Sequence, residues 1–182
     1  MKENSVTING VKWATCNVDK PGTFAATPES FGMYYQWGRN IAWSENDPLT
    51  SSDGTRWNKI AYKYKLWRPK NDPSPVGWRL PTLEEFESLF DEAKVISEWT
   101  TQNGVTGRKF TDKATGASIF LPAAGCRNRE DGSLNSPGTR GFYWSSTAYN
   151  TELAYDMFFN SEKNFESYPF KIYATPLRCV AD

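Results

Sequence analysis

The chain has 182 residues, 21 lysines and arginines balanced by 21 aspartates and glutamates, and no histidine. Without histidine, Ser-His-Asp and Cys-His catalytic pairs are excluded, as are zinc or copper sites that use histidine ligands. A formal net charge of zero argues against a protein that binds DNA or anionic lipid by neutralising phosphates. We therefore expect no nucleic-acid partner and no direct insertion into a membrane.

A single domain covering residues 1–182 is expected at this length. No stretch approaches the roughly 18–20 consecutive apolar residues of a membrane span. Met1–Ser5 lacks the apolar stretch of a signal peptide. These features predict a soluble domain without a signal peptide in this chain.

The first predicted element is a β-hairpin at the N-terminus. Residues alternate in polarity on both sides of Asn9-Gly10, a pair that tolerates the positive φ angles of a type I′ turn. Prolines recur through residues 20–81 and predict an irregular, tryptophan-rich segment, in which Thr27-Pro28 suits the start of a short helix.

A longer helix is predicted at residues 82–93. Thr82 and Glu85 have the spacing of a capping box, and apolar residues then recur at helical intervals from Leu83 to Phe90. Beyond this helix the pattern changes to that of strands, at 105–111, 118–121, 142–146, 154–160 and 174–180. The predicted fold class is α+β, with about two helices and late antiparallel strands.

The segment from Phe142 to Tyr173 is unusually aromatic, with 11 aromatic residues among 32, interleaved with Asn, Ser, Asp and Glu. This residue choice resembles an antibody paratope, in which rigid rings give contact area at low entropic cost and small polar groups give adaptable hydrogen bonds. An aromatic sheet core with polar residues on the other face has the same composition. Core and surface are expected to share the segment.

No group of residues has the spacing of a catalytic site. Cys16, Cys126 and Cys179 form no C-x-x-C pair and are expected to be buried apolar residues, with a Cys126–Cys179 disulfide as the alternative. Asn46-Asp47 and Asn71-Asp72 offer oxygen atoms in turns, but calcium needs about six to eight oxygen ligands. No cofactor is therefore predicted, with calcium as a minor alternative.

Six short motifs in order resemble one bacterial family. They are Gly10–Val18, Tyr34–Gly38, Pro75–Phe86 with its G-W-R-L-P-T run, Leu121–Gly125, Gly141–Thr147 with Y-W-S-S-T, and Leu177–Val180. Together they resemble the Fibrobacter succinogenes major paralogous domains, common in gut Bacteroidetes. The resemblance implies a C-type-lectin-like fold, related to the formylglycine-generating enzymes, with two helices and the termini brought together.

Two departures limit what the resemblance implies. The chain lacks the Glu-Pro-Asn, Gln-Pro-Asp and Trp-Asn-Asp triplets of calcium-dependent sugar sites. It also lacks the paired active-site cysteines of formylglycine-generating enzymes, for which only Cys126 and Cys179 are candidates. Residues 141–180 further resemble the variable segment of diversity-generating retroelement proteins, in which mutation of adenines in Asn codons yields Asp, Tyr, Ser or Phe.

We therefore predict a non-enzymatic recognition domain, of receptor-binding or adhesin type, displayed on a virion or cell surface. It would bind a protein or glycan on a cell surface through residues 149–173. The predicted ligand-binding residues are Tyr149, Asn150, Asp156, Phe158, Asn160, Phe165, Tyr168 and Tyr173. The alternatives are a formylglycine-generating-type oxidase that uses Cys126 and Cys179, and a structural subunit of a surface fibre. The oligomeric state and the ligand's identity are left open.

Overall fold

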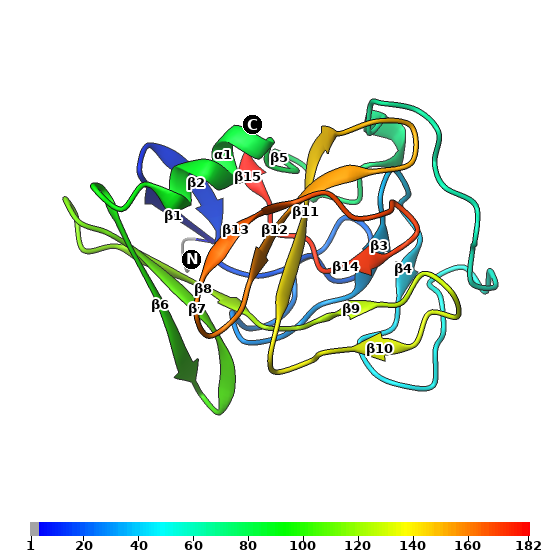
Figure 1. Cartoon of the computed structure of the whole chain (residues 1–182), viewed down its shortest axis with the longest axis horizontal. Coiled ribbons are helices and arrows are strands. Elements are labelled where there is room, and N and C mark those ends of the chain that lie inside the picture. Colours follow the sequence, from blue (N-terminus) through cyan, green and yellow to red (C-terminus); the bar gives the residue numbers. More distant parts are fainter. Residues whose placement is uncertain (1–3) are drawn as a thin grey trace.

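The computed structural model describes residues 4–182, so residues 1–3 of the predicted domain and of the Met1–Ser5 segment lie outside the described part (Figure 1). Strands account for 39% of the chain and helix for 6%, with one short α-helix in the described part. The prediction of an α+β, C-type-lectin-like fold with about two helices is therefore wrong. The structure consists mostly of small antiparallel sheets.

Residues 4–182 form four antiparallel sheets. The first orders its strands β1 (Ser5–Ile8), β2 (Val11–Ala14), β15 (Val180–Ala181) and β5 (Trp78–Arg79). The second orders them β10 (Leu134–Asn135), β9 (Cys126–Arg127), β14 (Ala174–Thr175), β3 (Tyr34–Gln36) and β4 (Ala42–Trp43). The third contains β11 (Gly141–Ala148), β12 (Ala154–Phe159) and β13 (Asn164–Ser167), and the fourth β6 (Val95–Gln102), β7 (Val105–Asp112) and β8 (Ser118–Pro122).

The predicted N-terminal hairpin is present as β1 and β2. Asn9 and Gly10 have φ angles of 46° and 78°, the left-handed conformation that a type I′ turn requires. Strand β15 pairs with β2, so the two ends of the described chain share one sheet, and Figure 1 shows them on the same side of the molecule. The third sheet crosses the middle of the view, between the β6–β7 hairpin and the second sheet.

The predicted capping box is present, but the helix is shorter than predicted. Thr82 and Glu85 each accept a backbone N–H from the other, and α1 spans Leu83–Glu87 before one 3₁₀ turn, η2 (Ser88–Phe90). The chain then leaves the helix at Asp91, whose Oδ1 accepts from the N–H of Ala93 in a turn that competes with helix continuation.

The second predicted helix is absent. At Thr27 the chain makes one turn, closed by the N–H of Ser30 donating to the carbonyl of Thr27 and by contact between their hydroxyls. The other helical segment in the described chain is a single 3₁₀ turn, η1 (Pro69–Asn71). Proline density through this region leaves no stretch long enough for a stable helix.

The later strands lie close to their predicted ranges, with one correction. The strand predicted at 174–180 is divided into β14 and β15, which belong to different sheets. Pro176 has no N–H to donate to a ladder, and the carbonyl of Leu177 instead accepts from Val18. Strands β3 to β6, β9, β10 and β13 were not predicted. β6 pairs with β7 along its whole length, across a turn at Asn103-Gly104 with φ angles of 47° and 81°.

The core is built mainly from rings. One cluster gathers Trp13 and Phe86 with Tyr143 and Phe159, and another gathers Trp37, Trp67 and Trp144 around Leu177. Helix α1 lies against the third sheet, which therefore has a well-packed inner face. Burial of rings at about 150–250 Å² each explains how an apolar fraction of only 38% builds this core.

A buried guanidinium joins these parts. Arg178 is fully buried and donates from Nη1 to the carbonyl of Ala14, from Nη2 to that of Phe120, and from Nε to Oδ1 of Asn17, at 3.2, 3.0 and 2.9 Å. Asn17 in turn donates to the hydroxyl of Tyr143 at 3.1 Å. Burial lowers the pKa of Arg178, and its charge is balanced by carbonyl and amide dipoles.

We expect Arg178→Met to lower the free energy of unfolding by about 3 kcal/mol or more, because three buried acceptors lose their donor. Urea unfolding followed by tryptophan fluorescence measures this. Arg56→Met is the control, since Arg56 is exposed, and it should change stability by no more than about 0.5 kcal/mol. Equal effects of the two substitutions would contradict a structural role for Arg178.

Candidate functional site

The structure separates the eight predicted ligand-binding residues into four environments. Asn150 and Asn160 lie in turns, and Tyr149 and Tyr168 lie in an exposed tyrosine cluster. Phe158 and Phe165 belong to a row of phenylalanines, and Asp156 and Tyr173 line a pocket.

Both predicted asparagines hold turns of the third sheet. Oδ1 of Asn150 accepts from the N–H groups of Glu152 and Leu153, both at 2.8 Å, between β11 and β12. Oδ1 of Asn160 accepts from Glu162 and Lys163 at 2.9 and 3.0 Å, between β12 and β13. These side-chain oxygens stabilise the turns, as asparagine commonly does.

Three tyrosines form a cluster where β11 and β12 meet, named here the tyrosine surface: the exposed Tyr149 and Tyr168 and the half-buried Tyr155. The rings of Tyr149 and Tyr168 stack with centroids 4.7 Å apart and planes at 12°, although the side chains are 49% and 54% exposed. Tyr155 meets both rings edge to face, at 5.6 and 5.9 Å. The three rings hold one another in place before any ligand is present.

Two further exposed apolar residues, Leu66 and Phe170, lie beside the strands that lead to the tyrosine surface. Leu66 bridges to Thr147 and Phe170 to Leu153, which brings two separate loops beside the β11–β12 turn.

The buried ammonium of Lys171 donates to the carbonyls of Tyr62, Tyr64 and Thr151 at 3.2, 2.8 and 3.3 Å. Burial lowers its pKa to about 8. Lys171 thus ties the 62–64 segment to the turn that carries Tyr149.

The predicted phenylalanines lie side by side across the third sheet. Phe142, Phe158 and Phe165 are in cross-strand register, with ring centroids 5.0 and 4.9 Å apart. All three are half-buried, and the ammonium of Lys163 lies 5.0 Å from the centre of the Phe165 ring. Such rows stabilise sheets by roughly 0.2–1 kcal/mol per pair, so this row accounts for part of the aromatic content structurally.

A pocket of about 250 Å³ lies between the third sheet and strands β9 and β14. Its lining includes the buried residues Cys126, Asp156 and Thr175, the half-buried rings of Phe142 and Tyr173, and the exposed Arg140. Pro169 also lines it and directly follows Tyr168, so the pocket adjoins the tyrosine surface along the chain.

Asp156 is the electrostatic centre of this pocket. The side chain is fully buried, Oδ1 accepts from the hydroxyl of Ser167, and Oδ2 has no hydrogen-bond partner. Burial raises the pKa of this carboxyl from 3.8 to about 7, and the Ser167 hydrogen bond only partly opposes the shift. The charged form is disfavoured until a donor reaches Oδ2.

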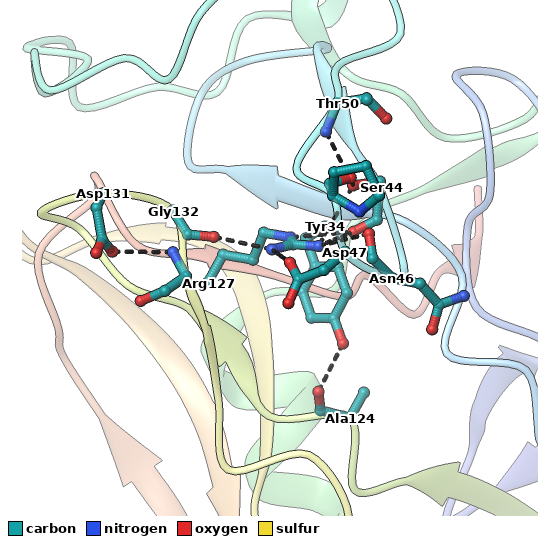
Figure 2. A network of polar contacts seen from close by, with 11 residues as sticks. Tyr34, Ser44, Asn46, Asp47, Thr50, Ala124, Arg127, Asp131 and Gly132 are labelled. Atoms are coloured by element: carbon teal, nitrogen blue, oxygen red, sulfur yellow. Dashed lines mark hydrogen bonds and ion pairs between the residues drawn. The ribbon is translucent and has the colours of Figure 1, made fainter.

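The β9 wall of the pocket is fixed from behind by Arg127. Figure 2 shows the buried guanidinium between two loops, with hydrogen bonds to the carbonyls of Ser44, Asn46 and Gly132 at 2.7, 3.1 and 2.9 Å and an ion pair to Asp47 at 3.2 Å. It also lies 5.6 Å from the centre of the Tyr34 ring. This network makes the neighbouring Cys126 a rigid part of the pocket.

The two Asn-Asp pairs considered for calcium are used within the protein. Asp47 pairs with Arg127, Asp72 accepts from the N–H of Ser74, and the Asn71 side chain donates to the carbonyl of Gly38. Among residues 4–182 no three His, Cys, Asp or Glu side chains gather in a way that could hold a metal ion. Within the same range, no helix has the length and apolar character needed to cross a membrane.

Cys126 and Cys179 are both free thiols and both buried. Burial raises the pKa of each thiol to about 12, with the nearby Asp156 adding to the shift at Cys126. Cys179 donates a hydrogen bond to the hydroxyl of Ser74 at 3.3 Å. Because the reactive form of cysteine is the thiolate, these environments disfavour nucleophilic chemistry at either position.

Arg140 and Tyr155 were not among the predicted site residues. Tyr155 lies inside the aromatic segment, between the buried residues Ala154 and Asp156 of β12. The alternation of side chains along a strand is the signal that could have identified Tyr155 as the more exposed residue. Arg140 precedes β11 in a turn and carries no sequence pattern that separates it from other exposed arginines. Leu66 comes from a loop more than 80 residues before the tyrosine surface, so only the fold brings it there.

A family described as a domain of unknown function, DUF8237, matches residues 98–180, from within β6 to β15. The match includes the tyrosine surface and the pocket residues from Cys126 to Thr175, but it covers less than half of the chain. Neither the curated proteins nor the solved structures contain a match to this chain.

Asp156→Asn should remove a pH dependence of stability. The folded-state pKa of Asp156 is raised to about 7 from 3.8, so the folded protein binds this proton more tightly than the unfolded chain does, and stability falls as the pH rises from about 4 to about 7. Asparagine cannot titrate, so the variant should gain stability relative to the wild type across that range.

Urea unfolding at pH 4.5, 6, 7 and 8 measures the difference between the two proteins. Glu162→Gln, at an exposed position in the β12–β13 turn, is the control and should follow the wild-type curve. If Asp156→Asn also ran parallel to the wild type at every pH, the raised pKa would be refuted.

The cysteines should differ in reactivity. Cys16 is partly exposed, whereas Cys126 and Cys179 are buried with raised pKa values, so iodoacetamide at pH 8 should label only Cys16 in the folded protein. All three should react in 8 M urea. Mass spectrometry of peptides gives the extent of labelling, and rapid labelling of Cys126 and Cys179 would instead favour an oxidase.

Proposed function

We propose that this chain is a non-enzymatic recognition domain that binds a protein or a glycan through the tyrosine surface. The observation that carries the proposal is the parallel stacking of Tyr149 and Tyr168, two large rings that remain about half exposed. Exposed rings grouped on one face of a protein commonly mark an interaction site. Tyrosine also combines an apolar body with a hydroxyl that needs a partner.

The supporting structure is rigid, which favours recognition. The three tyrosines contact one another, Asn150 fixes the β11–β12 turn, and Lys171 ties the adjacent loop to Thr151. Side chains that are already ordered lose little entropy when a ligand binds. Exposed polar residues such as Thr151 and Glu152 adjoin the rings, as in an interface with an aromatic centre and a polar rim.

The biological setting is part of the same proposal. The resemblance to Fibrobacter succinogenes major paralogous domains and to retroelement-diversified proteins favours display on a virion or cell surface, with residues 141–180 open to variation. Tyr149, Tyr155 and Tyr168 lie within that segment and project from strands and turns whose backbone hydrogen bonds do not depend on the side chain.

The tyrosine surface is tested by the double variant Tyr149→Ala/Tyr168→Ala. Removal of both rings should weaken binding at least tenfold while the melting temperature changes little, because the rings are half exposed. The wild-type chain is first tested on arrays of immobilised glycans and purified bacterial surface proteins, and the variant is then measured on the probe that binds. Ile96→Ala is the control, since Ile96 on β6 is 47% exposed.

Three outcomes would contradict the proposal. The first is unchanged binding by the double variant, and the second is a collapse of its melting temperature, which would assign the rings to the core. The third concerns self-association. Light scattering at high protein concentration should give a monomer, and a dimer that the double variant dissociates would make the tyrosine surface a subunit interface, as in a fibre.

A further inference from the structure

The pocket that adjoins the tyrosine surface at Pro169 is lined by a carboxyl group and a guanidinium that do not pair with each other. Asp156 and Arg140 both line it, yet no ion pair joins them among the described residues. A buried carboxylate is normally paired or fully hydrogen-bonded, because burial of an isolated charge is costly. Asp156 instead has only the Ser167 hydroxyl at Oδ1, and its Oδ2 is unpartnered and fully buried.

Arg140 is equally unengaged. Within residues 4–182 its guanidinium makes no hydrogen bond or ion pair, whereas its backbone is held at both ends: its N–H donates to the carbonyl of Ser136, and its carbonyl accepts from the N–H of Gly125. The fixed backbone holds the start of this side chain at the pocket lining, and five N–H donors remain for a ligand.

We infer that this pocket binds a small zwitterion of the amino-acid type, with its ammonium group on Oδ2 of Asp156 and its carboxylate on the guanidinium of Arg140. Arginine recognises carboxylates with two parallel hydrogen bonds, and an ammonium supplies the donor that Oδ2 lacks. A ligand with only one charge would leave one of the two protein charges unpaired.

The size and walls of the pocket fit this class of ligand. A volume of about 250 Å³ corresponds to roughly eight water molecules at about 30 Å³ each, which suits a molecule of amino-acid size. Phe142, Pro169 and Tyr173 provide apolar wall for a short side chain. Thr175 is already engaged, since its hydroxyl donates to Pro176 and accepts from Trp144. Asp156 and Arg140 therefore determine the charge of the ligand.

The inference stands on residues other than the tyrosine surface and does not depend on the proposed function. The double variant Tyr149→Ala/Tyr168→Ala keeps both charged residues of the pocket. It should therefore bind the zwitterion as the wild type does, even if its binding to a protein or glycan is lost.

Calorimetric titration at pH 7.5 tests the inference. The probes are glycine, L-alanine, L-leucine, β-alanine and γ-aminobutyrate, which vary the distance between the charges and the size of the side chain. Ethylamine and propionate carry one charge each. At least one zwitterion should bind at a millimolar or lower dissociation constant, and each singly charged probe at least tenfold more weakly.

Asp156→Asn and Arg140→Gln should each weaken binding of that zwitterion at least tenfold. Arg56→Gln, at an exposed arginine outside the pocket lining, is the matched control and should bind as the wild type. Each variant's melting temperature is measured in parallel, so that loss of folding is distinguished from loss of binding.

The inference is overturned if no zwitterion in the series binds, or if Arg140→Gln leaves binding unchanged. It is also overturned if ethylamine binds as tightly as the zwitterions, since the pocket would then be a site for cations alone. Retained binding by a folded Asp156→Asn variant would exclude the assigned role of Oδ2.

Discussion

The arrangement of the sheets depends on one buried guanidinium. Arg178 lies between β14 and β15 and reaches Ala14 in β2, Phe120 in β8 and Asn17 after the N-terminal hairpin. These contacts join three segments that are distant in sequence, and Asn17 extends the network to Tyr143 in β11. Removal of Arg178 would leave three buried acceptors without this donor, so the side chain links the first and fourth sheets directly and the third sheet through Asn17.

Buried cations that bind several backbone carbonyls also occur elsewhere in the described chain. Arg127 and Lys171 are buried and donate mainly to backbone carbonyls, and each fixes loops around the candidate site. Loops without regular ladders leave carbonyl groups unpaired, and buried cations satisfy several of them at once. Asp156 is different, because a buried carboxylate needs donors and receives only the hydroxyl of Ser167. Unlike the carbonyl groups that these cations bind, Oδ2 of Asp156 has no donor within the described chain.

The sequence correctly predicted local features, but its predictions were wrong for features that depend on contacts between residues distant in the chain. The Asn9-Gly10 turn and the Thr82–Glu85 capping box are present as predicted, since both depend on backbone geometry within four residues. The fold class was wrong because the helical pattern after Thr82 ends at the Asp91 turn, and the segment at Thr27 closes only one turn. Strand β6 was missed because its alternation of polar residues does not identify a strand until its pairing with β7 is known.

For the candidate site, composition alone determined that residues 142–173 are rich in rings and small polar groups, and that histidine chemistry is excluded. Only the tertiary structure decided which residues are exposed. Asn150 and Asn160 face their own turns, Asp156 faces a pocket, and Tyr149 stacks on Tyr168 in the open. Composition gives the number of rings, but burial and pairing depend on strand register and on loops from the first half of the chain, which no local pattern encodes.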